Sequence, residues 1–100
     1  MKNYYLYILA GQAQGPIFME VTSDLLSRMK SHKSGYLSQT AFRIDQLVHI
    51  EQFSTYASAK KRVEALKSAS REWVDALIER KNPHWIDLLS PVKVEAQYAA

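Results

Sequence analysis

The chain of 100 residues has no cysteine, three glycines, three prolines and no long apolar run. Without a thiol it can form neither a disulfide framework nor a thiolate metal site. The absence of cysteine fits a reducing compartment, and we expect the cytoplasm. Every apolar stretch is shorter than the ~20 residues that span a bilayer, so we expect no membrane segment. The run that follows Lys2 is too short and too rich in tyrosine for a signal peptide.

The chain also has little excess of one charge. Its 13 Lys and Arg against 10 Asp and Glu give a net charge of +3. This bias permits a nucleic-acid partner, although many ordinary domains carry as much. What the chain does contain is apolar material, since 47% of its residues are hydrophobic and 11% are aromatic. Such a composition is typical of a folded globule, and the length suits a single domain with one core.

Three β-rich runs are separated by turn residues. Residues 3–10 read "NYYLYILA" and residues 17–22 read "IFMEVT", with the glycine-containing "AGQAQGP" between them. These patterns predict two strands joined as an antiparallel hairpin. The third predicted strand is the core of "FRIDQLVHIEQF", from Leu47 to Phe53, and residues 36–41 before it are expected to form a polar loop.

Three further segments carry apolar residues three and four positions apart, which is typical of amphipathic helices. They cover about residues 23–34, 55–68 and 71–81. Thr22 or Ser23 is the expected cap of the first helix, with Gly35 as its left-handed stop, and Ser54 or Thr55 is the expected cap of the second. The residues expected to face inward are Leu25, Leu26, Met29, Tyr56, Ala59, Val63, Leu66, Trp73, Val74, Leu77 and Ile78.

The order of elements is β-β-α-β-α-α, which predicts an α+β fold with a small three-stranded sheet flanked by helices. Asn82-Pro83 ends the last helix, and Trp85 is expected to anchor a docking turn after it. Residues 1–89 therefore form the predicted domain, and residues 90–100 form a predicted flexible tail. The sequence contains no internal repeat or linker that would divide the domain.

Four stretches together resemble the GIY-YIG nuclease superfamily, in particular the small stand-alone bacterial endonuclease-like proteins of the UPF0213 type. They are "YYLYILA", "VTSDLLSRMKSHKSG", "LVHIEQF" and "ALKSASREWVDALIERKNPHWIDLL". The second and fourth stretches are the specific ones, and the resemblance covers about residues 4–89. It implies the GIY-YIG fold and a metal-dependent endonuclease of the DNA repair or recombination type, which hydrolyses phosphodiesters.

The resemblance also implies where the site lies. Tyr7 falls on the tyrosine of the first signature, Arg28 on the family arginine of the first helix, and His32 on the histidine one turn later. In the family these groups act with Mg²⁺ or Mn²⁺, which a glutamate of the second helix holds. The arginine stabilises the charge of the phosphate, while a tyrosine or a metal-bound water supplies the base.

Three positions of this chain depart from the family pattern. Phe18 keeps the ring of the second signature tyrosine but lacks its hydroxyl, and Glu20 stands in place of a glycine. Val63 occupies the position of the metal-binding glutamate, and a valine cannot ligate a hard cation. We therefore expect weak or no cleavage and no bound cofactor, unless Glu20 or Glu64 rebuilds the metal site.

Glu20 has two interpretations. It can replace the lost metal ligand, or it can form an inert ion pair with Arg28, which is the stronger expectation. Glu64 is expected to point to solvent, because one residue along a helix rotates the side chain by about 100°. His49 is expected on the surface of a strand and His84 in a turn, neither with a second metal ligand.

The same residues also have plain structural interpretations. Tyr7 can be a packing aromatic, and Arg28 with His32 can be an ordinary solvated face of a helix. The residues expected to contact a nucleic acid are Arg28, Lys30, Lys33, Lys60, Lys61 and Lys67. They form either one phosphate-contacting face or two separate solvated faces, and the second arrangement is the usual one for charged helices.

Three functions therefore stay open. The first is a protein derived from an endonuclease, with weak or no activity. The second is a non-catalytic module that binds nucleic acid, and the third is a protein-interaction domain in which Glu20 blocks the old site. Open positive potential around Arg28 favours the first two, whereas a closed pair of Glu20 and Arg28 favours the third. The sequence specifies neither a nucleic-acid substrate nor an oligomeric state.

Overall fold

The computed structural model describes residues 2–89, which contain a sheet of three antiparallel strands. The strands are β1 (Tyr4–Ala10), β2 (Ile17–Thr22) and β3 (Gln46–Phe53), in the order β2-β1-β3. The predicted hairpin of β1 and β2 is confirmed, and its register places Tyr7 opposite Glu20. The central strand β1 is paired on both sides, so β2 and β3 are the edges of the sheet.

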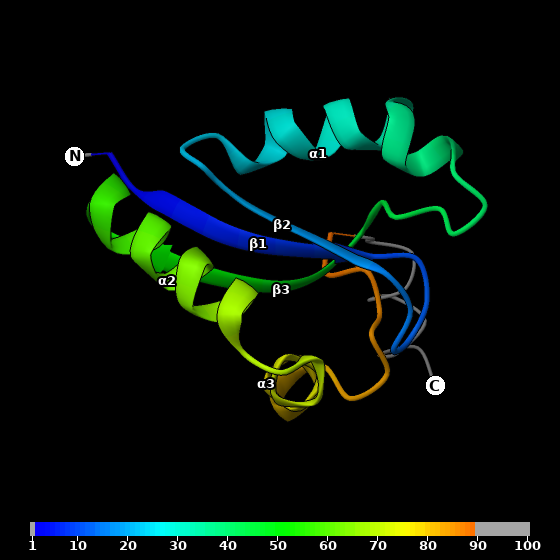
Figure 1. Ribbon diagram of the computed structural model, residues 1–100. Coiled ribbons are helices and arrows are strands. Elements are labelled where there is room, and N and C mark those ends of the chain that lie inside the picture. The colour runs from blue at the N-terminus through cyan, green and yellow to red at the C-terminus, as the bar shows by residue number, and fades with distance from the viewer. Residues whose placement is uncertain (1, 90–100) are drawn as a thin grey trace, which may run out of the picture.

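Helices lie on both faces of this sheet (Figure 1). α1 (Leu25–Ser34) runs along one face, whereas α2 (Tyr56–Ser68) and α3 (Arg71–Lys81) lie on the other. The α+β class and the order β-β-α-β-α-α are confirmed. One element differs from expectation, because the segment predicted as a polar loop begins with a short 3₁₀ helix, η1 (Tyr36–Gln39).

The alternation of side chains along β1 divides them between two apolar cores. Leu6 and Ile8 belong to a cluster on the side of α2 and α3, together with Ala10, Met19, Val48, Val63, Leu66, Val74, Leu77, Ile78 and Trp85. Tyr7 and Leu9 belong to a smaller cluster on the side of α1, together with Met29, Ile44 and Leu47. Because β1 is buried on both faces, it reads as a continuous apolar run rather than as an alternating pattern.

The caps of the helices agree with the sequence in part. Thr55 caps α2 as predicted, and its side chain accepts a hydrogen bond from the Ser58 amide at 3.1 Å. The predicted cap of α1 is wrong, because Asp24 accepts from the Ser27 amide at 3.2 Å. Asp24 lies one residue nearer the helix than Ser23, and its carboxylate reaches the free amide of Ser27. Gly35 is not a left-handed stop either, since its φ of −98° and ψ of −169° are extended.

Three large side chains that were expected inside are exposed. Leu26 is 65% exposed, Tyr56 53% and Trp73 47%. Each helix buries only one narrow stripe, and these residues lie beside that stripe rather than on it. Two of them still gain partial cover at the surface. The Tyr56 ring stands edge-on to Tyr4 at 5.9 Å, and the guanidinium of Arg62 lies 5.7 Å from the centre of the Trp73 ring.

A β-bulge in β3 overturns the expected surface position of His49. The register shifts between Ile8, which pairs with His49, and Leu9, which pairs with Leu47. Val48 is the extra residue of the bulge and has no partner on β1. His49 is only 5% exposed, and its Nε2 lies 2.9 Å from Glu51 Oε2. Arg62 of α2 in turn donates two hydrogen bonds to Glu51, at 2.9 and 3.1 Å. The bulge thus points the side chain of His49 into the layer between β3 and α2.

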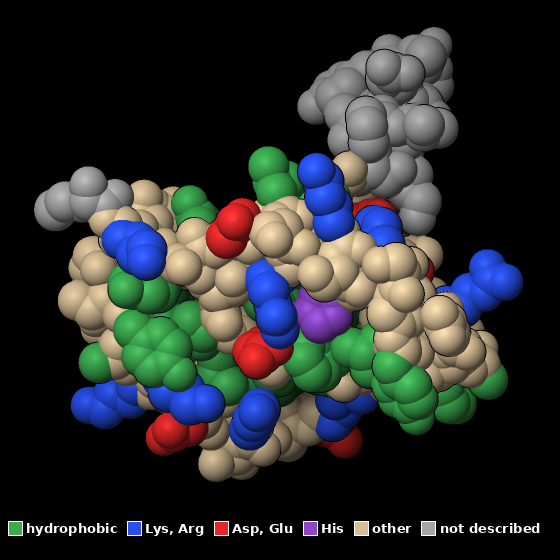
Figure 2. All heavy atoms as spheres, turned by 90° about the horizontal axis from the view of Figure 1, so that it is seen from above, with side chains coloured by type: hydrophobic (Ala, Val, Ile, Leu, Met, Phe, Trp, Pro, Cys, Tyr) green, Lys and Arg blue, Asp and Glu red, His purple; other side chains and the backbone are tan. Residues whose placement is uncertain are grey.

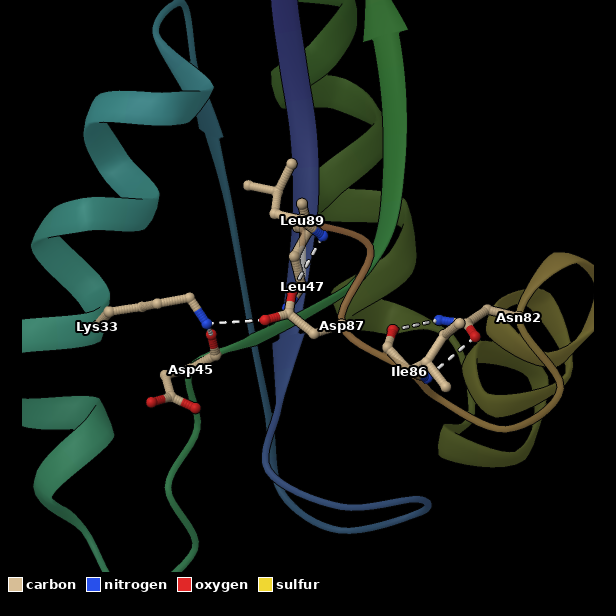
Figure 3. A network of polar contacts seen from close by, with 7 residues as sticks. All are labelled: Lys33, Asp45, Leu47, Asn82, Ile86, Asp87 and Leu89. Carbon is tan, nitrogen blue, oxygen red and sulfur yellow. Dashed lines mark hydrogen bonds and ion pairs between the residues drawn. The ribbon is translucent and has the colours of Figure 1, made fainter. Parts of the chain in front are cut away.

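The segment after α3 docks back onto the sheet, as predicted for the turn at Trp85. The Trp85 side chain is 3% exposed, and its Nε1 donates to Glu79 at 2.8 Å. Asn82 holds the start of this segment, because its side chain donates to the Ile86 carbonyl at 2.9 Å and accepts from the Ile86 amide at 3.1 Å (Figure 3). The predicted tail at residues 90–100 lies outside the described residues.

Asp87 fixes the end of the same segment between α1 and β3 (Figure 3). Its Oδ2 accepts from Lys33 Nζ at 2.8 Å, and its Oδ1 accepts from the amides of Leu47 and Leu89, each at 3.2 Å. Lys33 also donates to the Asp45 carbonyl at 3.2 Å. The Leu88 amide donates to the Leu47 carbonyl at 2.8 Å, so the segment covers the edge of β3 at Leu47.

None of the helices in residues 2–89 combines the length and the apolar character that crossing a bilayer would require.

Candidate functional site

The residues singled out from the first strand and first helix meet on the α1 side of the sheet. The hairpin register places Tyr7 on β1 directly opposite Glu20 on β2. Arg28 and His32 are one turn apart on α1, so both side chains leave the same face of that helix. Both reach the pair below them, because Arg28 contacts Glu20 and His32 contacts Tyr7. We call these four residues the Tyr7–Glu20 cluster.

Glu20 lies between a cation and a phenol. Its Oε2 accepts a hydrogen bond from Arg28 Nη2 at 2.9 Å and another from the Tyr7 hydroxyl at 3.3 Å. The Tyr7 oxygen lies 2.9 Å from His32 Nε2. One hydroxyl carries only one proton, so Tyr7 can donate to Glu20 only when His32 presents an N–H at Nε2. With that tautomer all three contacts are satisfied at the same time.

Phe18 forms the apolar wall of the cluster. The centre of its ring lies 5.2 Å from the His32 ring, which it meets edge-on, and 6.3 Å from the Tyr7 ring. The ring has the shape of the tyrosine that the resemblance implies at this position. It has no hydroxyl, so it can neither transfer a proton nor orient a water molecule at this wall.

The surroundings of the cluster shift three pKa values. Burial raises the pKa of Tyr7 above its usual value of 10.0, and Glu20 adds to this rise while Arg28 opposes it. Burial, and then the charge of Arg28, lower the pKa of His32 from 6.5, although Glu20 works in the other direction. Tyr7 and Glu20 raise the pKa of Arg28. At neutral pH the cluster therefore holds a neutral phenol, a neutral imidazole and a permanent cation.

The cluster is buried at its base and open at its top. Tyr7 is fully buried, whereas the side chains of Arg28 and Glu20 are 43% and 45% exposed. Figure 2, which looks onto the α1 side, shows a histidine at the surface between acidic and basic side chains. A dissolved anion can therefore approach Arg28 from solvent, but it meets the carboxylate of Glu20 beside it.

The residues present do not fit a divalent metal. Val63 is 2% exposed and packs among Leu6 and Ile8, on the face of the sheet opposite to Tyr7. Glu64 is exposed on α2, as expected. Within residues 2–89, no three His, Asp or Glu side chains are grouped closely enough to hold a metal ion. Among the described residues, Glu20 is the one carboxylate in contact with the cluster, and Arg28 already engages it.

The basic residues named from the sequence fall into separate groups. Lys30 and Lys33 belong to α1, and the Lys33 ammonium is engaged by Asp87. Lys60, Lys61 and Lys67 belong to α2, on the other face of the sheet. Lys60 and Lys67 line hollows beside β2. The structure thus brings Arg28, His32 and Tyr7 together but does not join the lysines to them in one face.

Two buried polar groups were missed by the sequence. The contacts of Asp87 join residues 54 and 40 positions apart, so no local spacing signals them. His49, Glu51 and Arg62 come together only because β3 bulges. The available signals were a lone aspartate within the apolar "HWIDLL" and alternating polar residues in "VHIEQF".

The sheet order, the placement of the helices and the Tyr7–Glu20 cluster define a small α+β domain with a polar site between its first helix and its first hairpin. Among solved structures, the solution NMR structure of a UPF0213 protein from Bacillus halodurans is similar to this chain. It has a TM-score of 0.50 and 26% sequence identity, and the match covers 80% of this chain and 86% of that chain. This likeness supports the UPF0213 family for the chain. No protein-family model and no curated protein sequence matches it.

Proposed function

We propose that this chain is a GIY-YIG-type domain of endonuclease descent that binds DNA at the Tyr7–Glu20 cluster and cleaves it weakly or not at all. One observation carries the proposal. The carboxylate of Glu20 sits against both the Arg28 guanidinium and the Tyr7 hydroxyl, which is the position an anionic phosphate would need. The site thus keeps hydrogen-bond donors for an anion, but the carboxylate of Glu20 already occupies two of them.

Arg28 has donors to spare for a phosphate. A guanidinium carries five N–H donors in a planar fork that matches phosphate oxygens. Within residues 2–89 the guanidinium of Arg28 donates one hydrogen bond, from Nη2 to Glu20. With 43% of the side chain exposed, the remaining donors are open to solvent. A phosphate can therefore bind Arg28 beside Glu20, but the two anions repel each other.

The same site lacks what fast hydrolysis needs. Phosphoryl transfer in this class depends on neutralising charge at the leaving oxygen and on activating the attacking water. Phe18 offers no hydroxyl, and Val63 places an apolar side chain in the opposite core. Tyr7 and His32 can still exchange a proton, but within residues 2–89 no carboxylates and histidines are grouped to hold a metal that would stabilise the leaving oxygen. Binding without efficient cleavage is the result.

The test measures DNA binding with and without the charge at position 20. A fluorescently labelled branched DNA is titrated by anisotropy with wild type, Glu20→Gly and Glu20→Gly with Arg28→Ala. A unit charge pair a few Å apart is worth up to ~4 kcal/mol at an effective dielectric of about 20, and exposure and salt reduce it strongly. We expect Glu20→Gly to bind several-fold tighter, more so at low salt, and the gain to vanish with Arg28→Ala.

A matched pair of variants separates the site from the net charge. Glu20→Gln and Glu64→Gln remove the same charge, the first within the cluster and the second on exposed α2. Only Glu20→Gln should strengthen binding clearly. Equal gains in both variants would mean that DNA responds to total charge, which would contradict binding at the cluster. In the presence of Mg²⁺, wild type and Glu20→Gly should leave branched and nicked DNA uncut over hours.

A protein-interaction domain is the second candidate, and the closed pair of Glu20 and Arg28 favours it. In that function the carboxylate seals the cluster, and the surface serves a protein partner instead of a phosphate. It predicts that Glu20→Gly, folded like wild type, leaves DNA affinity unchanged at all salt concentrations.

A further inference from the structure

The outer side of β2 is an unpaired strand edge. The sheet order β2-β1-β3 gives β2 a neighbour on one side only. Within residues 2–89, no backbone group of Ile17–Thr22 forms a hydrogen bond outside the sheet. β3, the other edge strand, is covered at Leu47 by both Asp87 and Leu88. Natural proteins usually protect such edges, because exposed N–H and C=O groups pair with other chains.

A groove runs along this open edge. Two hollows of about 410 and 180 Å³ lie side by side and share Phe18, Met19 and Lys67 in their walls. Successive residues of β2 line them, although successive side chains point to opposite faces of a strand. The side chains of Phe18 and Glu20 point toward α1, and the other walls come from α2 and the residues after it, so the hollows lie beside β2 on the α2 side of the sheet. Five residues of strand give the groove a length on the order of 15 Å.

The floor of the groove is aliphatic and its outer rim is basic. Ile17, Leu66, Ala69 and Val74 supply the apolar surface of the larger hollow. Lys60 and Lys67 stand on the α2 side, and no described carboxylate pairs with either of them. Basic side chains are spaced along the lower margin of Figure 2, interrupted by acidic ones.

Two further charged residues line the groove but are already engaged. Arg71 bonds with Asp75 and with the Gly15 carbonyl, while Glu20 is held by Arg28. The charge that the groove offers to a partner is therefore that of the two lysines, and it is positive.

We propose that the β2 edge binds an extended acidic peptide as a fourth, edge-added strand. The backbone groups of β2 would pair with the peptide, as in other complexes where a strand is added to a sheet. Apolar side chains on one face of the added strand would enter the hollows, and carboxylates on that same face would meet Lys60 and Lys67. This inference goes beyond DNA binding at the Tyr7–Glu20 cluster and does not depend on it.

A peptide fits this edge better than a nucleic acid does. An unpaired strand recognises another backbone that carries N–H and C=O groups at the same spacing, which a sugar-phosphate chain lacks. Binding of single-stranded nucleic acid typically relies on stacking against exposed aromatic rings. Here the floor is mainly aliphatic, the Phe18 ring packs against His32 and Tyr7, and the exposed ring of Tyr56 lines the smaller hollow only.

The test uses an acetylated and amidated peptide of about ten residues in which every second residue is threonine and the residues between are valine and glutamate in turn, so that valine and glutamate share one face of the added strand. It is titrated into the ¹⁵N-labelled full chain, and the amide shifts are mapped. We expect the largest changes at Ile17–Val21, with weak binding in the range of roughly 0.1–1 mM, because a short flexible peptide loses much of its entropy on ordering. A peptide with N-methyl groups on alternate residues keeps every charge but cannot pair, and it should not bind.

Matched lysine variants test the rim. Lys60→Gln with Lys67→Gln and Lys30→Gln with Lys61→Gln each remove two exposed charges, but only the first pair lines the groove. We expect the first double variant to bind the peptide roughly 3- to 10-fold more weakly and the second to bind it nearly as wild type does.

Several outcomes would overturn the proposal. They are shifts confined to α1, equal binding of a peptide with lysine in place of glutamate, equal binding of the N-methylated peptide, or no binding at millimolar concentration. Displacement of the peptide by oligo(dT), with larger shifts at β2 from the nucleotide itself, would assign the groove to single-stranded DNA instead. A homodimer in sedimentation with β2 protected from hydrogen exchange would assign it to a second copy of the chain.

Discussion

The hydroxyl of Tyr7 links His32 to Glu20, because both residues contact its oxygen. Arg28 acts on both neighbours, since it holds Glu20 directly and lowers the pKa of His32 through its charge. Any change at one of these residues should therefore be measurable at the others. His32 is the convenient reporter because the protonation of an imidazole can be followed directly by NMR.

The first prediction concerns the pKa of His32. Arg28→Met should raise it, because the guanidinium that disfavours the imidazolium is gone, whereas Glu20→Gln should lower it further, because a favourable negative charge is gone. The measurement is an NMR titration of the His32 ring proton at Cε1 in wild type and in each variant. Opposite shifts are required, and two shifts of the same sign would show that the ring does not respond to these charges.

The lowered pKa of His32 also sets a direction for stability. Between 6.5 and the lower pKa of the folded state, the unfolded chain binds the proton more readily than the folded chain does. The contribution of His32 is therefore complete above 6.5 and declines as the pH falls through that window. Arg28→Met should make this decline smaller. Urea unfolding at several pH values between about 5 and 7.5 would show it.

A second prediction at the same scale concerns Val63, which packs in the core at 2% exposure. Val63→Glu does not restore a metal ligand to the Tyr7–Glu20 cluster but buries a carboxylate. We expect a loss of about 3 kcal/mol or more in the free energy of unfolding. Ala65→Glu on the exposed side of α2 is the control and should change stability by about 0.5 kcal/mol or less. A stable Val63→Glu protein that binds Mn²⁺ would contradict this geometry.

Part of the candidate site could be predicted from the sequence. Tyr7, Arg28 and His32 could be expected to meet because a hairpin register and a four-residue helical spacing are regular geometries. Whether Glu20 would face a metal or Arg28 could not be decided from spacing. Both outcomes use the same strand position, and only the rotamers within the packed cluster choose between them.

At the scale of elements, the segment after α3 is tied to α1 and β3 through Asp87 (Figure 3). Burial alone would raise the pKa of Asp87, but the Lys33 ammonium and the amides of Leu89 and Leu47 outweigh it and hold the pKa below 3.8. A carboxylate with a lowered pKa stabilises the fold above its unfolded value and loses that contribution as the pH falls through the folded value.

The third prediction follows from this contact. Asp87→Asn keeps an oxygen for the Leu47 amide but loses the charge that Lys33 needs, so the free energy of unfolding should fall by about 1–3 kcal/mol near pH 7. The difference from wild type should shrink as the pH falls below 3.8. Urea unfolding at both pH values measures it. In a double-mutant cycle with Lys33→Met the two losses should be less than additive, and full additivity would mean that the pair contributes nothing.

The strands and helices were predictable because their signals are local. Apolar residues at spacings of two or of three and four mark each element, and the outline of three strands and three helices follows from them. The exceptions have non-local causes. The bulge that buries His49 depends on how β3 pairs with β1, and the exposure of Leu26 and Trp73 depends on which stripe of each helix the sheet can cover.

For the molecule as a whole, the sheet separates two surfaces with different chemistry. On the α1 side two cations are neutralised within the chain, since Arg28 faces Glu20 and Lys33 faces Asp87, while Lys30 is exposed. Beside β2, Lys60 and Lys67 have no such described partner. A net charge of +3 therefore says less about function than its distribution does. DNA at the Tyr7–Glu20 cluster must displace or tolerate a carboxylate, whereas an acidic peptide at β2 meets none that is available.

The last prediction tests the chain as a single folding unit in the presence of metal. A ligand that binds only the folded state stabilises it by RT ln(1 + [L]/Kd), so about 10 mM Mg²⁺ with a Kd of at least ~10 mM adds no more than ~0.4 kcal/mol. For a domain of this size such a gain raises the Tm by less than about 3 °C. A rebuilt site with a Kd of ~0.1 mM would add about 2.7 kcal/mol, or roughly 10–20 °C.

The expectation is the small shift, because no group of three candidate ligands lies within residues 2–89 and Glu20 is engaged by Arg28. Thermal unfolding with Mg²⁺ or Mn²⁺ is compared with NaCl at the same ionic strength, since screening alone changes the Tm of a charged protein. Glu20→Gln and Glu64→Gln identify the ligand if a large shift does occur. A shift of about 10 °C that Glu20→Gln alone removes would show that Glu20 binds metal in preference to Arg28.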